Sequence, residues 1–193
     1  NLMVQKYFPD ALHALAKVVS PMLPHGADIK RRHPGAKVVF AGPCISKKAE
    51  AESYPGAIDC VLTFEELAQW MERRGIKPED AAGTGNDPEQ RSGRRSGTFP
   101  LAGGIIEAME LPEDSGYEYI TIDGVDNCMA ALKDISGGKL GRCFVEMSAC
   151  AGSCVGGPAM GRPALPVGDA LAVRRRIGAG EYETEQPSAK ALE

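Results

Sequence analysis

The stretch AKVVFAGPCISKKAE, residues 36–50, decides the fold. Its first six residues are apolar or β-branched for the most part, which predicts a strand over 36–41. Gly42 and Pro43 then turn the chain, and a helix is predicted to begin near Cys44. A strand followed at once by a helix is the repeating unit of α/β folds.

The same alternation recurs along the chain. Thr63, with Glu66 three residues on, forms a capping box that predicts the start of a helix running to about Arg74. Alternating strands and helices predict an α/β fold, with a mostly parallel sheet, flanking helices and right-handed crossovers. The other expected strands are 57–62, 117–123 and 141–147, and the other expected helices are 10–19, 101–110, 125–135 and a short one near 168–176.

Composition favours one soluble globular domain, because 43% of the 193 residues are hydrophobic and 25% are charged. We expect the domain to cover 1–160, with a flexible loop at 76–98 and a weakly structured tail at 161–193. The net charge of −4 argues against a nucleic-acid partner. No apolar run approaches the roughly 20 residues of a membrane span, and no signal peptide opens the chain.

The chain is therefore expected to be cytoplasmic, without a membrane span. In that reducing compartment its six cysteines should be free thiols or metal ligands. Cys44 follows a buried-type strand where a helix begins, and a helix N-terminus favours a thiolate. Lys47, three residues on, shares its helix face and can donate a hydrogen bond to an anionic ligand. The alternative, a buried small thiol beside a solvent-facing lysine, stays open.

Cys150 and Cys154 also follow a predicted strand, and the small residues between them let the backbone approach a cluster closely. A C-x3-C pair alone is a weak signal, because zinc sites use matched sets of ligands. With Cys44, the pair suggests an iron–sulfur cubane whose fourth ligand lies elsewhere. The remaining cysteines are predicted to pack in the core: Cys60, Cys128 and Cys143.

Taken together, these segments resemble the signatures of iron-only (diiron) hydrogenases. Residues 42–50, GPCISKKAE, are similar to Met-Pro-Cys-x-x-Lys-Lys-x-Glu, and residues 146–154, EMSACAGSC, to Glu-x-Met-Ala-Cys-Pro-Gly-Gly-Cys. Residues 99–107, FPLAGGIIE, resemble a Phe-Gly-x-x-Gly-Gly-x-x-Glu segment. Residues 1–22 resemble the stretch that follows the first signature, which is expected upstream. The resemblance covers about 1–160 and implies part of a two-lobed catalytic domain.

The resemblance implies a 4Fe–4S cubane joined through a cysteine sulfur to a two-iron unit that carries CO and cyanide. Cys44 and Cys150 would ligate the cubane, and Cys154 would ligate it and bridge to the two-iron unit. The implied reaction interconverts two protons, two electrons and dihydrogen. The implied partners are an electron-transfer protein or adjoining iron–sulfur domains. The cluster is predicted to be absent from this chain alone, which should then be inactive.

Beyond the cysteines, the resemblance gives Lys47 the role of donor to a cyanide, Glu50 that of a proton-path glutamate and Phe99 that of lining the diiron pocket. In the chain alone, Lys47 is expected to lack an anionic partner. Gly42 and Ser148 stand beside the cluster where the family pattern has methionine.

These smaller side chains, together with Ala151 and Ser153 in place of Pro and Gly, resemble the sensory subclass of the family. In that subclass the cluster reports hydrogen instead of turning it over quickly. Two other classes stay open: a non-catalytic iron–sulfur protein used in cluster assembly or electron transfer, and a zinc-binding module.

Overall fold

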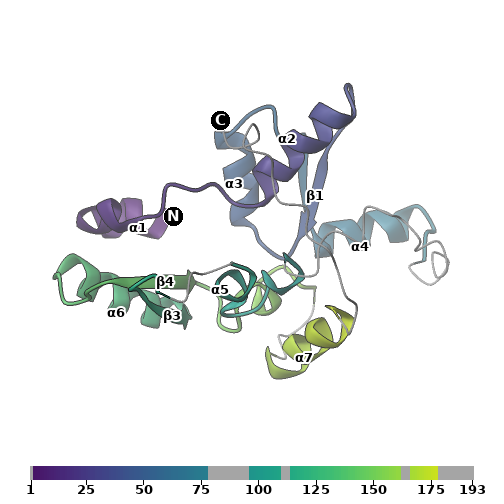
Figure 1. The fold of residues 1–193 in the computed structure, drawn as a ribbon. Helices are drawn as coiled ribbons and strands as arrows, with labels where there is room; N and C mark the ends of the chain where they lie inside the picture. Colours follow the sequence, from purple (N-terminus) through teal and green to yellow (C-terminus); the bar gives the residue numbers. More distant parts are fainter. Residues whose placement is uncertain (1, 78–95, 110–113, 162–165, 178–193) are drawn as a thin grey trace.

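The computed structural model describes residues 2–77, 96–109, 114–161 and 166–177, which form two α/β units (Figure 1). Each unit is built on a two-stranded parallel sheet: β1 (Val39–Gly42) with β2 (Cys60–Thr63), and β3 (Glu118–Asp123) with β4 (Cys143–Ser148). The predicted α/β class with parallel strands and flanking helices is confirmed. The strands are divided between two sheets, and each sheet carries its own helices.

The first unit packs around β1 and β2. Its core consists of Met22, Leu23, Val38 and Ile58, with Phe40 and Val61 of the sheet packed against it. The helices of this unit are α2 (Met22–Arg32), α3 (Ser46–Ser53) and α4 (Phe64–Arg73). Figure 1 shows α2 and α3 beside β1, whereas α4 projects from the unit.

Two features of the first unit test the predicted helices. The capping box at α4 is confirmed, since the Thr63 hydroxyl accepts the Glu66 amide and the Glu66 carboxylate accepts the Thr63 amide. Helix α2 is not predicted by the sequence pattern, because Pro24 falls inside it. Pro24 lies in the first turn of α2, where its missing N–H costs no hydrogen bond.

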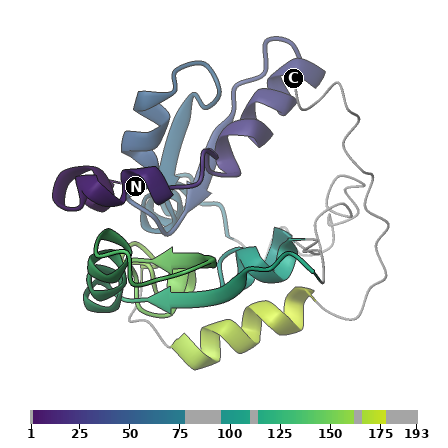
Figure 2. The same cartoon turned by 60° about the vertical axis from the view of Figure 1, so that its left-hand side comes forward.

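The second unit packs around β3 and β4, and it also holds the N-terminal residues of the chain (Figure 2). Val4 and Ala11 form a core with Leu132 of α6. The helix expected over 10–19 is instead a 3-10 helix, and a separate helix precedes it. The elements here are α1 (Leu2–Tyr7), η1 (Pro9–Ala14), η4 (Ser96–Thr98), α5 (Gly104–Ala108), α6 (Val125–Ser136), η5 (Ser153–Gly156) and α7 (Pro166–Ile177).

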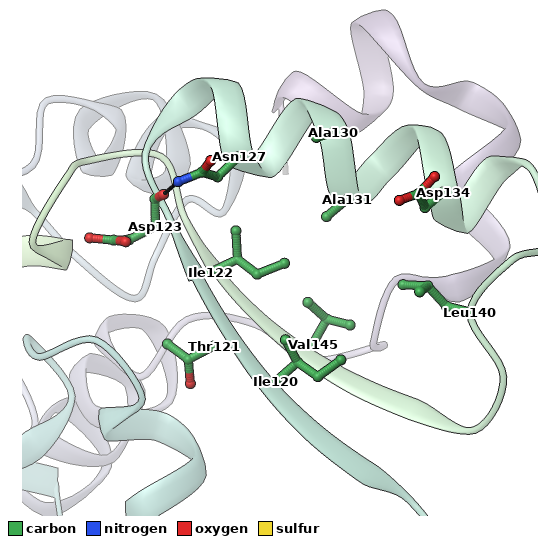
Figure 3. A pocket seen from close by; sticks show the side chains of 10 residues that line it. All are labelled: Ile120, Thr121, Ile122, Asp123, Asn127, Ala130, Ala131, Asp134, Leu140 and Val145. Carbon is green, nitrogen blue, oxygen red and sulfur yellow. Dashed lines mark hydrogen bonds between the residues drawn. The ribbon is translucent and has the colours of Figure 1, made fainter.

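The two faces of the β3–β4 sheet have different neighbours. Ile120, Ile122 and Val145 line a hollow of about 410 Å³ between the sheet and α6 (Figure 3). Next to Val145 along β4, Glu146 is buried and accepts a hydrogen bond of 2.9 Å from the Ile106 amide of α5. No cysteine lines the hollow.

The segments predicted to be irregular are described in part. Residues 78–95 of the expected loop lie outside the described residues, and 96–98 form η4. Helix α7 matches the short helix expected near 168–176 and lies within the segment predicted as a tail, where it packs against η4 and η5. Residues 162–165 and 178–193 lie outside the described residues. None of the described helices is long and apolar enough to cross a bilayer.

The prediction that three cysteines pack in the core holds for one of them. Cys128 is buried, with 4% of its surface exposed. Cys60 is exposed, so its prediction is wrong, and Cys143 is half-buried. Both are the first residues of their strands, β2 and β4. A sequence pattern shows which residues of a strand are apolar. It does not show whether other elements pack over them.

Candidate functional site

The Gly42–Cys44 turn lies where the two units meet. Cys44 comes just after the carboxyl end of β1, and the Pro43 carbonyl accepts a hydrogen bond of 3.3 Å from the Ala159 amide. A Cβ built on Gly157 would lie 2.8 Å from the Pro43 oxygen. The backbone of the first motif therefore contacts the segment that follows the second motif.

The Cys150–Cys154 segment is a tight backbone turn at the carboxyl end of β4. The Ser153 amide donates to the Cys150 carbonyl at 3.0 Å, and the Gly157 amide donates to the Cys154 carbonyl at 2.9 Å. Gly152 has a φ of 77°, a left-handed conformation that glycine adopts without steric cost. Both cysteines are thus fixed on a short, hydrogen-bonded loop.

The three thiols of the two motifs lie close enough to affect one another electrostatically. Cys154 is exposed as a residue, but the protein atoms around its sulfur desolvate the thiol and raise its pKa, and the negative charges of Cys44 and Cys150 raise it further. Burial also raises the pKa of Cys150, again with a contribution from Cys44. The structure therefore brings together residues that are 106 positions apart in sequence (150 − 44).

This donor set fits an iron–sulfur group. Thiolates that repel one another are stabilised by a cationic centre, and cysteine thiolates are the usual ligands of iron–sulfur clusters. Among the described residues, no three His, Cys, Asp or Glu side chains form a ready site for a single metal ion. The roles of Cys44, Cys150 and Cys154 as ligands remain predictions.

Three polar side chains brace the cysteine loop, and one of them was not predicted. The Asp123 carboxylate, at the end of β3, accepts a hydrogen bond of 2.6 Å from the Gly152 amide. The hydroxyls of Ser148 and Ser153 lie 2.9 Å apart. The position of Asp123 at a strand's carboxyl end was the available sequence signal, because parallel strand ends meet at one edge.

Ser153 occupies an unfavourable backbone conformation. Its φ of 61° is the one positive φ of a non-glycine among the described residues. A left-handed conformation costs a residue with a side chain roughly 1–2 kcal/mol. The side chain is 2% exposed and hydrogen-bonded, so its contacts hold the residue in this conformation.

Lys47 has an anionic partner, contrary to the expectation for the chain alone. Its ammonium lies 2.5 Å from the Glu50 carboxylate, one turn along α3. Burial acts to raise the pKa of Glu50, but hydrogen bonds from Lys47 and from the Ser20 backbone amide outweigh it, and the net pKa is lowered. The Lys47 charge also acts to lower the pKa of Cys154, so the ammonium is close enough to affect that thiol.

The segment that contains Phe99 lies beside the cysteine loop. The carbonyl of the next residue, Pro100, accepts a hydrogen bond of 3.2 Å from the Val155 amide in η5. Phe99 itself is half-buried. The backbone thus brings Phe99 to the region of the three thiols, and its role in lining a diiron pocket remains a prediction.

Gly42 and Ser148 end β1 and β4, opposite Thr63 and Asp123 respectively. A Cβ at Gly42 would lie 2.8 Å from the Phe40 ring, so a methionine here would require that ring to move. The position of the Phe40 ring therefore favours glycine at residue 42. That either residue lies beside a bound cluster remains a prediction.

Both the sequence and the fold resemble those of known proteins. Residues 1–115 and 109–158 match the family model for the iron only hydrogenase large subunit, C-terminal domain. A structure of HydA(deltaEFG), described as revealing stepwise FeFe-hydrogenase H-cluster assembly, matches with a TM-score of 0.65 and 18% identity, over 89% of this chain and 62% of that one. A variant of FeFe-hydrogenase HydA1 from Chlamydomonas reinhardtii matches with a TM-score of 0.66, 18% identity and the same coverage.

A human protein, nuclear prelamin A recognition factor, is 28% identical over 159 residues, which is 62% of this chain and 35% of that protein. The chain thus spans about a third of the curated relative and about three fifths of the solved hydrogenase chains. The family model covers most of the described residues, both cysteine motifs included. The chain belongs to the family defined by the C-terminal domain of the iron-only hydrogenase large subunit.

Proposed function

We propose that Cys44, Cys150 and Cys154 hold a 4Fe–4S cluster, linked through Cys154 to a diiron unit with CO and cyanide, and that the full-length protein interconverts protons, electrons and dihydrogen. The observation that carries the proposal is the convergence of the three thiols between the two units. It occurs in a chain of the iron-only hydrogenase family, with the cysteines in two of the family's signatures.

When bound, the iron cluster supplies the redox chemistry, and the protein supplies ligands, orientation and electrostatics. The turn at Gly42–Cys44 and the loop at Cys150–Cys154 present thiolates from two different units, and the backbone contacts at Pro43 tie these units together. This arrangement fixes the ligands before any cluster is bound, which reduces the cost of ordering them.

Lys47 and Glu50 supply fixed charge beside the thiols. The Lys47 ammonium holds a proton on Nζ, and its charge offsets part of the negative charge of Cys154. The Glu50 carboxylate accepts two hydrogen bonds, from the Lys47 ammonium and the Ser20 amide, and these bonds hold its pKa below its usual range.

We propose a sensory role for the protein rather than rapid turnover of hydrogen. The same role accounts for Gly42 and Ser148, which put small side chains where the family's signatures have methionine. We propose that the protein responds to hydrogen and passes electrons to adjoining iron–sulfur domains or to an electron-transfer protein. The six free cysteines suit a reducing compartment such as the cytoplasm.

A non-catalytic iron–sulfur protein, used in cluster assembly or electron transfer, is the second candidate. One observation favours it: the human relative is named for recognition of prelamin A rather than for hydrogen chemistry. In that case the same three cysteines would hold a cubane without a diiron unit. Lys47 then has no cyanide to bind, and its pairing with Glu50 would be permanent.

Infrared spectroscopy of the full-length protein, produced together with the maturation proteins of a diiron hydrogenase, separates the two candidates. The hydrogenase proposal predicts stretching bands from metal-bound CO and cyanide that respond to hydrogen. A protein that holds a full complement of cubane iron and gives no such bands would be a non-catalytic relative.

A further inference from the structure

Glu146 is a buried carboxylate on the face of the β3–β4 sheet that lies away from α6. Only 5% of its surface is exposed. Side chains alternate along a strand, so Glu146 shares this face with its register partner Thr121. Figure 3 shows Thr121 pointing away from α6, whereas Ile122 points toward it. Because a buried polar group requires a hydrogen-bond partner, the partner of Glu146 shows which part of the chain it holds.

That partner is the first turn of α5. Oε2 of Glu146 accepts a hydrogen bond of 2.9 Å from the Ile106 amide, 40 residues away in sequence. The first amides of a helix have no acceptor within the helix, and an N-cap side chain often supplies one. The N-cap of α5 is Gly103, which has no side chain to do so. Glu146 therefore caps α5 from a strand of the sheet.

The glycines at the start of α5 bring its backbone close to neighbouring atoms. A Cβ on Gly103 would lie 3.1 Å from the Thr121 hydroxyl, and a Cβ on Gly104 would overlap the Thr98 carbonyl. The Thr98 hydroxyl also donates to the Gly104 carbonyl at 2.8 Å. The start of α5 thus has little room to move toward the sheet, and the bond to Glu146 prevents it from moving away.

The segment that α5 ends lies beside the cysteine loop. Phe99 and Pro100 come just before α5, and the Pro100 carbonyl accepts a hydrogen bond of 3.2 Å from the amide of Val155, the residue after Cys154. Residues 98–107 contain no cysteine, so the segment supplies no thiol ligand. Its position therefore affects the space beside the thiols and leaves the ligand set unchanged.

A second side-chain contact reaches α5 from the opposite direction. Arg174 of α7 pairs with Glu107 at 3.1 Å, and their side chains are 51% and 46% exposed. Exposed ion pairs of this kind contribute little to stability. The buried bond from Glu146 is consequently the contact that fixes α5.

We propose that Glu146 is a positioning residue, which caps α5 and thereby fixes residues 99–107 as one side of the cluster pocket. It acts through the reach of its oxygen to the Ile106 amide and not through its charge. This inference rests on the proposed cluster site and adds which residue determines the shape of the pocket around it.

Hydrogen exchange of the full-length, metal-free protein tests the positioning role without a cluster. Glu146→Gln keeps an oxygen at the same reach, so the amides of 104–107 should exchange at close to wild-type rates. Glu146→Asp keeps the charge but is one methylene shorter. Exchange should then rise about tenfold or more, as in Glu146→Ala, because a hydrogen bond to a charged group is lost.

Two outcomes of this measurement would overturn the positioning role. One is wild-type exchange in Glu146→Asp together with fast exchange in Glu146→Gln, which would show that the charge matters and the reach does not. The other is an equal acceleration in the β1–β2 unit of Glu146→Asp, which would show a general loss of stability.

Two control variants separate this bond from other contacts. Arg174→Ala removes the exposed ion pair of the same helix and should leave exchange at 104–107 unchanged. Asp59→Ala removes a carboxylate that accepts the Val38 amide at 2.8 Å in the first unit. It should speed exchange near β1 and leave α5 at its wild-type rate.

Infrared spectroscopy of the matured full-length protein tests the link to the pocket. Glu146→Asp should keep its cubane iron and sulfide, whereas its CO and cyanide bands should shift or disappear, and Glu146→Gln should restore them. Wild-type bands in a Glu146→Asp protein whose α5 exchanges faster would overturn the inference that Glu146 shapes the pocket. A wild-type protein without such bands would instead contradict the diiron proposal, and the exchange rates would still decide whether Glu146 positions α5.

Discussion

The two cysteine motifs are held by different kinds of contact. In the first unit, Cys44 passes directly into α3, and the charges beside it form a lysine–glutamate pair on that helix. In the second unit, the Cys150–Cys154 loop is held by a carboxylate and two hydroxyls that bond backbone or one another. The backbone at Cys44 is held by the helix that follows it. The Cys150–Cys154 loop is held by three side chains, those of Asp123, Ser148 and Ser153.

This difference decides which changes should disturb the site. A motif that continues into a helix tolerates surface substitution, because its backbone bonds are made within the helix. A loop held by a few side chains depends on each of them. Changes where the two motifs touch should have the largest effect, since they move both.

Gly157→Ala is expected to have the largest effect. The added Cβ would lie 2.8 Å from the Pro43 oxygen and 2.9 Å from the Cys154 oxygen, both backbone atoms, and relief of the contact with Pro43 requires the two motifs to move apart. The backbone at Gly157, with φ −62° and ψ 149°, is itself suitable for alanine. Overpacking of this kind costs roughly 1–3 kcal/mol, and iron uptake should fall as well.

Gly141→Ala is the matched control, because nothing lies within 4 Å of a Cβ there. Urea unfolding and iron content measured on both variants check the prediction. Similar results for the two glycines would show that the motifs do not meet at Gly157.

Asp123→Ala is expected to have the next largest effect, because it leaves the Gly152 amide without its acceptor. Hydrogen bonds to charged groups contribute about 1.5–3 kcal/mol, and because Asp123 is only half-buried, water can replace part of this contribution, so the loss should be below that of Gly157→Ala. Asp123→Asn keeps a side-chain oxygen and should lose less. In the first unit, Asp28→Ala removes two ion pairs that reach solvent on α2, with Arg31 and Arg32, and should change urea unfolding little. If Asp28→Ala destabilises the protein more than Asp123→Ala, the contrast between the two units is wrong.

The two units should also lose stability at opposite ends of the pH range. In the first unit the shifted groups are carboxyls with lowered pKa values. The hydrogen bond from Lys30 leads those that lower the pKa of Asp59 to about 2. The hydrogen bond from Lys48 is the main cause that lowers the pKa of Glu66. A lowered pKa stabilises the folded state above the unfolded value, 3.8 for Asp and 4.5 for Glu, and that stabilisation is lost as pH falls through the folded pKa.

In the second unit the shifted groups are thiols and one lysine, all with raised pKa values. Burial is the main cause for Cys128, Cys150 and Cys154, and the hydrogen bond with Asp134 is the main cause for Lys139. Their stabilisation is complete below the unfolded values, 9.0 for the thiols and 10.5 for the lysine, and is lost as pH rises through the folded values.

Hydrogen exchange of the metal-free protein at acidic and alkaline pH checks this division. Acid should open the β1–β2 unit first, and alkali the β3–β4 unit first. The effect is expected to be the smallest of the three, because most of the carboxyls involved reach solvent. Opening in the reverse order would contradict the assignment.

The sequence predicted the elements that local patterns define. The strand before Cys44, the capping box at Thr63 and the helix after Gly124 all follow from periodicity and caps within a few residues. Helix α2 was missed, because a proline in a first turn looks the same in sequence as a proline in a loop. The exposure of Cys60 was missed, because coverage of a strand depends on elements elsewhere in the chain.

The candidate site divides in the same way. The cysteines, Lys47 and Glu50 could be found from motif spacing. The pairing of Lys47 with Glu50 required the side chains to be placed, since a lysine can turn toward solvent, a neighbour or a ligand. The contact of Asp123 with Gly152 joins residues 29 apart, one at the end of β3 and the other in the loop after β4. Only the register of β3 on β4 brings them together.

The central claim is that three cysteines hold a cluster between the two units. Counting iron and sulfide in variants that each lack one cysteine tests it most directly. Each variant of the full-length protein is reconstituted anaerobically and compared with Cys60→Ala, whose cysteine is exposed and outside both motifs. The account predicts that Cys44→Ala, Cys150→Ala and Cys154→Ala each lose most of the bound iron and sulfide, while Cys60→Ala keeps the wild-type content. Full retention in Cys44→Ala, or equal loss in Cys60→Ala, would contradict a cluster held between the two units.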